Sequence, residues 1–184
     1  QRVFTVSIHE ANRWPHTGAL DDRGGGQSRN MPVPRGFNDS ELDYLVSEAV
    51  LPLRDRFEPH AIVVTCGADG LAGDPLSKLQ LSNVGLWSAV ERALDHVNHA
   101  VVLGGGGYNP WTVVRCWSGL WGRLSGQKIP VSLPPGARDL LTGYECDLID
   151  EEDVEAHWLN TLADPLNTGP IRDEVARQAR SVLE

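Results

Sequence analysis

The stretch AIVVTCGADG, residues 61–70, decides the fold. Its first six residues are small, β-branched or apolar, so they predict a buried strand that ends at Gly67. Similar apolar runs near the start of the chain and before a run of glycines predict two more strands. We expect residues 2–8, 61–66 and 100–103 to be strands of one parallel sheet, because strands that are apolar on both faces are typical of parallel sheets covered by helices on both sides.

Helical patterns alternate with these strands. Asn38 is expected to start the first helix, and Pro52 to kink or break it. Ser82 is expected to cap a second helix, and Asn109, followed by a proline, to start a third. The alternation of strand and helix predicts an α/β fold with three layers, α/β/α, around a mainly parallel sheet.

Two segments fall outside this alternation. Residues 9–29 are rich in Gly, Asp, Asn and Arg and are expected to form a long irregular loop. After residue 133 the pattern weakens, so we divide the chain into a main part, residues 1–133, and a partly helical C-terminal extension, residues 134–184, with a last helix near its end. The chain opens on Gln1 at the edge of an apolar run, which favours a fragment of a larger domain.

Composition and charge narrow the function classes. The chain has 184 residues and a formal net charge of −9 without any run of Lys or Arg, so we do not expect its surface to bind nucleic acid. Its three cysteines, Cys66, Cys116 and Cys146, form no CxxC pair, which argues against a structural zinc site and a disulfide framework. This cysteine usage predicts a cytoplasmic protein, and no stretch resembles a signal peptide or a membrane span.

Two of the predicted strands end in unusual loops. Asp69 follows one strand among glycines, and Tyr108 follows the glycine run 104–107. Ligands of parallel sheets collect at the carboxyl ends of the strands, so both side chains are expected at one edge of the sheet. Asp69 is either a turn aspartate or an oxygen ligand for a metal ion, and Tyr108 is either a packing aromatic or part of a site. The glycine run has neither GxGxxG spacing nor a GK[ST] ending, which excludes both nucleotide fingerprints.

The order of several motifs resembles that of the histone deacetylase family. These motifs are VSIH (6–9), PHTG (15–18), GADGLAGDPL (67–76), LGGGGYN (103–109) and RCW (115–117). The quadruple glycine is similar to class I members, and the tail motifs HWLNTL and GPIRDEV are similar to bacterial deacetylases of the acetoin-utilisation type. The resemblance implies the arginase/deacetylase-like fold, and it implies that residues 1–133 are the C-terminal half of a catalytic domain.

The resemblance also implies roles for single residues. Asp69 matches the second aspartate of the family's Asp-His-Asp zinc site. Tyr108 matches the tyrosine that polarises the acetyl carbonyl, and its hydrogen bond strengthens as negative charge develops on the oxygen. Ser7 and Ile8 match positions that supply oxygens to a potassium site beside the zinc.

Three further positions match the walls of the narrow tunnel that holds the lysine methylenes. They are Trp14, Leu76 and Gly106. Trp14 stands where the family usually has phenylalanine, and His16 where it usually has glycine. The resemblance therefore implies a tunnel whose shape differs from that of typical members.

The family's remaining zinc ligands, an Asp-x-His pair, and its general-base histidines lie upstream of the strand that opens this chain, and nothing here replaces them. None of the six histidines sits in a motif that matches the family's zinc ligands or general bases. His96 and His99 have a spacing that zinc could use, although solvated histidines at a helix end are the simpler interpretation. A catalytic zinc needs three protein ligands, so the chain alone is expected to bind zinc poorly.

These observations predict part of a zinc-dependent enzyme that hydrolyses acetyl-lysine in proteins, or a small acetylated amine, and that needs the missing N-terminal half. Neither nucleic acid nor membrane is expected as a partner. A non-catalytic scaffold is one alternative, but a scaffold needs neither Asp69 nor Tyr108. An arginase-like enzyme with two metal ions is another, and it would need more aspartates near Asp69 than Asp74 alone.

Overall fold

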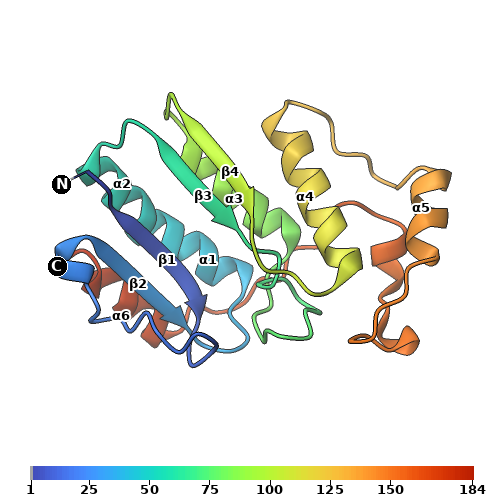
Figure 1. Ribbon diagram of the computed structural model, residues 1–184, viewed down its shortest axis with the longest axis horizontal. Coiled ribbons are helices and arrows are strands. Elements are labelled where there is room, and N and C mark those ends of the chain that lie inside the picture. Colours follow the sequence, from blue (N-terminus) through green and yellow to red (C-terminus); the bar gives the residue numbers. More distant parts are fainter. Residues whose placement is uncertain (1) are drawn as a thin grey trace.

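Figure 1 shows the computed structural model of the chain, which describes residues 2–184. Gln1, which opens the sequence, lies outside the described residues. Four strands form two parallel pairs. They are β1 (Thr5–Glu10), β2 (Ser28–Val33), β3 (Ile62–Cys66) and β4 (Ala100–Gly104). Three of the four lie where apolar runs predict strands.

Helices provide most of the remaining regular structure. They are α1 (Asp39–Leu45), α2 (Leu51–Phe57), α3 (Asn83–Leu94), α4 (Pro110–Leu124), α5 (Pro135–Thr142) and α6 (Asp173–Ser181). Shorter segments are η1 (Gly24–Gly26), the π turn η2 (Val46–Val50), η3 (Glu151–Asp153) and η4 (Ala156–Leu159). In the described part of the chain, no helix combines the length and the apolar character that crossing a bilayer requires.

Local capping signals place the helix starts as predicted. The Asn38 side chain accepts hydrogen bonds from two backbone N–H groups of α1, and the Glu41 carboxylate accepts one from the Asn38 N–H. Ser82 and Asn109 cap α3 and α4 through their own side-chain oxygens. These starts could be predicted because a cap depends only on residues within a few positions of it.

Pro52 is predicted to kink or break the helix, but it lies inside a continuous helical run from Asp39 to Phe57, so the helix does not break there. The π turn η2 directly precedes the proline, which occupies the first turn of α2. A proline lacks the N–H for the usual helical bond, and its ring crowds the carbonyl one turn earlier. The wider π turn accommodates both effects without ending the helix.

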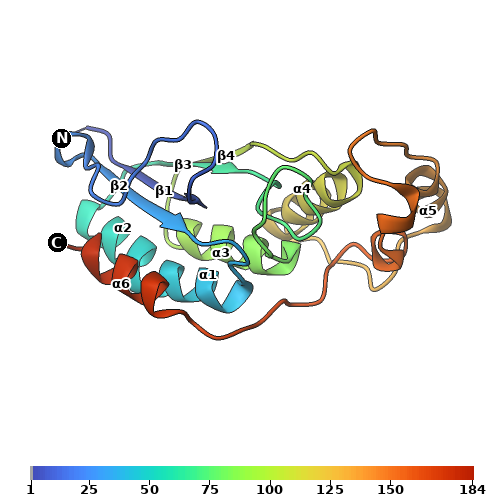
Figure 2. The same ribbon diagram turned by 90° about the horizontal axis from the view of Figure 1, so that it is seen from below.

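The strands do not form one hydrogen-bonded sheet, so that prediction is also wrong. Among the described strands, β1 pairs with β2 and β3 pairs with β4. The sequence of β2, SRNMPV, contains a proline and polar residues, so it carries no strand signal. The two pairs lie side by side in one layer (Figures 1 and 2), with their carboxyl ends together, since Glu10 in β1 contacts Lys78 in the loop after β3.

One face of this layer is open. The helices α1, α2, α3 and α6 all lie on the same face (Figure 2). On the opposite face, Val63, Val101 and Leu103 are 65%, 52% and 49% exposed. In the described residues helices cover one face of the strands only, so the chain forms two layers of the predicted three-layer α/β/α fold, which is incomplete here. Both faces of these strands are apolar, which is typical of a sheet that helices cover on both sides.

The C-terminal segment returns to the main core. Helix α6, close to its predicted position, buries Val175 and Ala179 almost completely beside α1 and β2, and Val182 directly after the helix is buried too. Helix α5 and η4 belong to a second, smaller cluster around Trp111 and Trp158. The division at residue 133 stays a prediction, and the two parts share a core.

Candidate active site

Asp69 lies in the loop that follows β3, with its carboxylate against Gly67 and Gly106. A Cβ atom at either glycine would collide with this carboxylate, so only glycine fits at both positions. The Asp69 side chain is half-buried. No residue between 2 and 184 donates a hydrogen bond to it, which leaves its lone pairs free for a ligand.

The loops that follow β3 and β4 are in direct backbone contact. The Ala68 N–H donates to the Gly106 carbonyl oxygen at 2.6 Å. A Cβ atom on Gly105 would lie 2.8 Å from the Cα of Gly67. Gly107 adopts a φ of +147°, in a region that residues with a side chain rarely enter. The glycine run therefore permits close approach of the two backbones, and it brings Asp69 and the loop of Tyr108 to one edge as predicted.

Asp74 fixes the backbone at Tyr108. Its carboxylate accepts hydrogen bonds from the Tyr108 N–H at 2.8 Å and from the Leu76 N–H at 2.9 Å. Burial raises the pKa of Asp74, and the backbone donors oppose that rise. Since both carboxylate oxygens are engaged, Asp74 is a positioning group. The sequence offered one signal for this role, an aspartate between Gly73 and Pro75 in a turn.

The Tyr108 side chain itself is 45% exposed. Within residues 2–184, no hydrogen bond to its hydroxyl and no aromatic ring contact involves it. Its neighbour Asn109 is fully buried, caps α4 and donates to the Gly73 carbonyl oxygen at 3.0 Å. The backbone of Tyr108 is thus held firmly while its phenol is available. A purely packing role for Tyr108 does not agree with this exposure.

Ser7 and Ile8 lie on β1, whose carboxyl end meets the same edge. The Ser7 hydroxyl is 2.9 Å from Nδ1 of His9, and Nε2 of His9 is 3.1 Å from the Gly18 carbonyl oxygen. Because a carbonyl only accepts, Nε2 carries the ring proton and Nδ1 accepts from Ser7. Burial lowers the pKa of His9, and the bond to Gly18 opposes it. His9 therefore supports the loop after β1, and the potassium site stays a prediction.

Glu10 joins two of the loops at this edge. Its carboxylate accepts from the Lys78 N–H at 2.8 Å and the Ser77 hydroxyl at 3.1 Å, and it pairs with Arg13 at 3.0 Å. Burial alone would raise the pKa of Glu10, but these donors together hold it below its usual value. No sequence signal indicates Glu10, since its partners on the second loop are almost seventy positions away.

Two of the predicted tunnel residues lie on the loops that Glu10 connects, and the third, Gly106, lies on the loop after β4. Trp14 follows Arg13 and is 85% exposed, and Leu76 precedes Ser77 and is 50% exposed. Gly106 lies against the Asp69 carboxylate. The exposure of the two apolar side chains agrees with a rim open to a ligand, and their part in a tunnel stays a prediction.

The described residues supply only part of a metal site. Residues 2–184 contain no group of three or more His, Cys, Asp or Glu side chains placed to hold one ion. A catalytic zinc takes three protein ligands, and Asp69 can provide one of them. The chain's own residues therefore do not fit a complete zinc site.

Residues 1–124 match the Histone deacetylase domain, which is two thirds of the chain. The chain belongs to the histone deacetylase family. Histone deacetylase 8 of Danio rerio is 32% identical over 139 residues, which are 72% of this chain and 37% of that protein. Human Histone deacetylase 1 is 33% identical over 138 residues, 72% of this chain and 29% of that protein.

The fold agrees with solved members of the histone deacetylase family. The crystal structure of an HDAC homologue from Aquifex aeolicus superposes with a TM-score of 0.89 at 33% identity, covering 98% of this chain and 50% of that one. A structure of an HDAC homologue complexed with SAHA gives the same values. The incomplete α/β fold of deacetylase type is thereby confirmed. The chain spans half the length of these solved relatives and less of the curated ones.

Proposed function

We propose that this chain carries part of the active site of a zinc-dependent deacetylase that hydrolyses acetyl-lysine or a similar acylated amine. One observation carries the proposal. Asp69 and Tyr108 lie on two contacting loops at one edge of the strands. The Asp69 carboxylate has no hydrogen-bond donor in the described chain, and the Tyr108 phenol is exposed. Neither group is sealed from solvent, so a ligand can bind both without displacing a protein partner.

The roles of the two residues follow from their chemistry. Asp69 would be one zinc ligand, and the other two would come from the rest of the domain. Zinc, when bound, supplies a Lewis acid that polarises the acyl carbonyl and lowers the pKa of water. Tyr108 would donate a hydrogen bond to the acyl oxygen and bind it more tightly as negative charge develops. The backbone clamp from Asp74 would keep the phenol in place before substrate arrives.

The rim favours a substrate with an aliphatic arm. Trp14 and Leu76 present exposed apolar surface on loops at this edge, which suits the methylenes of an acetylated lysine or of a small acetylated amine. Ser7 and Ile8 would provide oxygens for a potassium ion. The assignment to cytoplasmic, acetoin-utilisation-type bacterial deacetylases remains part of the proposal.

The second carboxylate of this loop speaks against the arginase-like alternative. A two-metal site needs several free carboxylates close together. Asp74 is only 4% exposed, and both of its oxygens accept backbone hydrogen bonds. It is therefore not available as a bridging ligand beside Asp69.

A pair of substitutions in the complete enzyme tests the proposal. Tyr108→Phe keeps the ring and deletes the hydroxyl, so kcat on an acetyl-lysine peptide should fall roughly 10²–10³-fold while bound zinc is unchanged. Asp69→Asn weakens a ligand, so bound zinc should fall together with activity. Metal content is measured by atomic absorption alongside steady-state kinetics. Near-normal turnover by Tyr108→Phe would refute the proposed role.

A further inference from the structure

Trp158 of η4 packs on the loop that holds Asp69 and Asp74. A Cβ atom at Gly73 would lie 2.5 Å from Cζ2 and 2.7 Å from Cη2 of Trp158, so the indole rests directly on the backbone of that glycine. Gly73 has a φ of +87°, which few other residues tolerate. Trp158 is 5% exposed and belongs to the cluster around Trp111, at the start of α4. A tail residue thus covers the loop of the candidate site.

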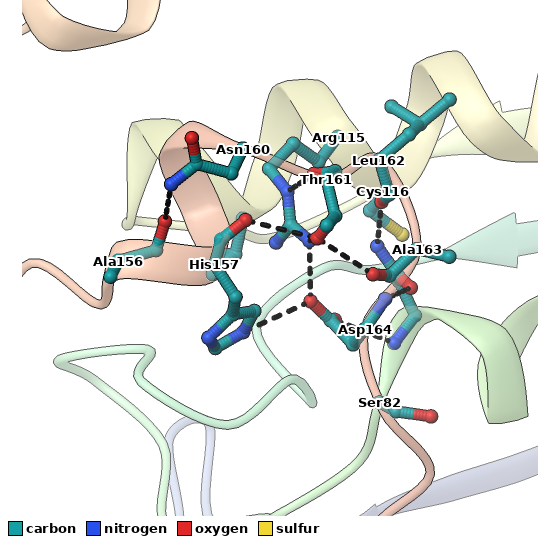
Figure 3. Close-up of polar contacts among 12 residues, drawn as sticks. Ser82, Arg115, Cys116, Ala156, His157, Asn160, Thr161, Leu162, Ala163 and Asp164 are labelled. Atoms are coloured by element: carbon teal, nitrogen blue, oxygen red, sulfur yellow. Dashed lines mark hydrogen bonds and ion pairs between the residues drawn. The ribbon is translucent and has the colours of Figure 1, made fainter. Parts of the chain in front are cut away.

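A buried polar network fixes the segment that carries Trp158 (Figure 3). Arg115 of α4, 1% exposed, donates to the Thr161 carbonyl oxygen at 2.7 Å and pairs with Asp164 at 2.7 Å. The Thr161 hydroxyl donates to the His157 carbonyl oxygen at 3.0 Å. Asp164 and Asn83, at the start of α3, exchange two backbone-to-side-chain hydrogen bonds. Segment 157–164 is therefore anchored to two helices.

From Trp158 a short series of contacts leads to Tyr108. The Gly73 carbonyl oxygen accepts a hydrogen bond from the side chain of Asn109, the residue after Tyr108. The carboxylate of Asp74, the residue after Gly73, accepts one from the Tyr108 N–H. The Cys146 thiol, also in the tail, lies 3.9 Å from the Tyr108 carbonyl oxygen. The tail thus contacts the Tyr108 loop at one point and its supporting loop at another.

We propose that Trp158 is a positioning residue for Tyr108. Its indole packs on Gly73. This contact keeps the Asp74 carboxylate in place to accept the hydrogen bond from the Tyr108 N–H, and so orients the Tyr108 side chain. This inference rests on the proposed function, because it assigns the tail a part in the work of Tyr108. A misplacement of about 1 Å in a catalytic group can cost 10²-fold in rate, so such support has a measurable effect.

A double-mutant cycle in the complete, zinc-loaded enzyme tests the inference. Trp158→Ala should lower kcat about ten- to hundred-fold, with KM and zinc content nearly unchanged. In the Tyr108→Phe background the same change should cost less than about twofold, because the hydroxyl that Trp158 positions is already gone. If Trp158→Ala does not fold, Trp158→Phe, which shortens the ring system, is used in the same cycle with a smaller expected loss.

Trp87→Phe is the matched control. Trp87 is 1% exposed and also packs its indole on a glycine, Gly119, but in the main core. The Trp87→Phe variant should lose stability like the Trp158 variant, while its kcat stays within about twofold of the wild-type value. If the kcat losses from the Trp158 and Tyr108 substitutions multiply in the double variant, or if the Trp158 variant loses zinc, the inference is overturned. If Tyr108→Phe alone has no effect, the proposed function fails first, so the two failures are distinguishable.

Hydrogen exchange provides a readout without turnover. In the chain itself, the Trp158 variant should speed exchange of the Tyr108 N–H at least tenfold, since that amide is bonded to Asp74. The Trp87 control should leave that amide unchanged relative to its neighbours. Equal exchange of the Tyr108 amide in the wild-type chain and the Trp158 variant would overturn the inference.

Discussion

At the scale of single residues, three carboxylates at one edge have different partners and therefore different tasks. Asp69 receives no hydrogen bond from the described chain and is free to bind a ligand. Asp74 accepts two backbone N–H groups and shapes the loop. Glu10 accepts from Ser77 and Lys78 and joins two loops. The number of donors, more than the residue type, separates the candidate ligand from the supporting groups.

Glu10→Gln should destabilise the chain by about 2 kcal/mol at neutral pH, because a buried charged acceptor becomes neutral. The folded pKa of Glu10 lies below the usual 4.5, so its stabilisation is present above that pH and is lost as the pH falls through the folded pKa. Urea unfolding at pH 7 and at a pH below 4.5 should show a smaller loss at the lower pH. The exposed Glu48→Gln is the control, and equal losses at both pH values would contradict the assignment.

Residues whose roles depend on local pattern could be predicted, and those that depend on long-range contacts could not. Asp69 and Tyr108 follow apolar strands among glycines, so the sequence indicated both. Glu10 and Trp158 act on loops that are more than sixty residues away along the chain. No spacing rule connects such positions without the fold, so the sequence alone does not indicate them.

At the scale of helices and strands, too, features set by local pattern could be predicted and features set by long-range contacts could not. Helix starts with a capping side chain lie where predicted, whereas β2 was missed because its pairing with β1 overrides its weak strand pattern. Helix α5 was missed because it begins at a proline pair without a side-chain cap. Helix α6 was found from its pattern, but its contact with α1 depends on Arg172 and Glu41, which are 131 positions apart.

Arg172→Ala tests how firmly α6 is attached. Glu41 is fully buried, and Arg172 donates to its carboxylate through both its side chain and its backbone N–H. Removing the guanidinium leaves a buried charge with fewer donors, so stability to urea should fall by about 3 kcal/mol. Arg123→Ala breaks the pair with Glu91, whose side chain is 32% exposed, so this change should cost no more than about 1 kcal/mol. Equal small losses would mean that α6 is held by its apolar face alone.

At the scale of the whole molecule, two features point to the same missing partner. The sheet layer has one open apolar face, and the chain spans half the length of its solved relatives. We propose that the rest of the deacetylase domain covers that face and brings the remaining zinc ligands to Asp69. Apolar strands predict a sheet that is covered on both faces, but the pattern cannot show which helices of the domain lie within this chain.

Zinc stoichiometry tests the central claim most directly, namely that this chain supplies one ligand of a site completed by the rest of the domain. Equilibrium dialysis is run on the chain alone and on the chain combined with the N-terminal half. The account predicts well under one tightly bound zinc per isolated chain, and one per complex once the halves are joined. One tightly bound zinc per isolated chain would contradict it, because the ion would then have ligands besides Asp69 within these residues.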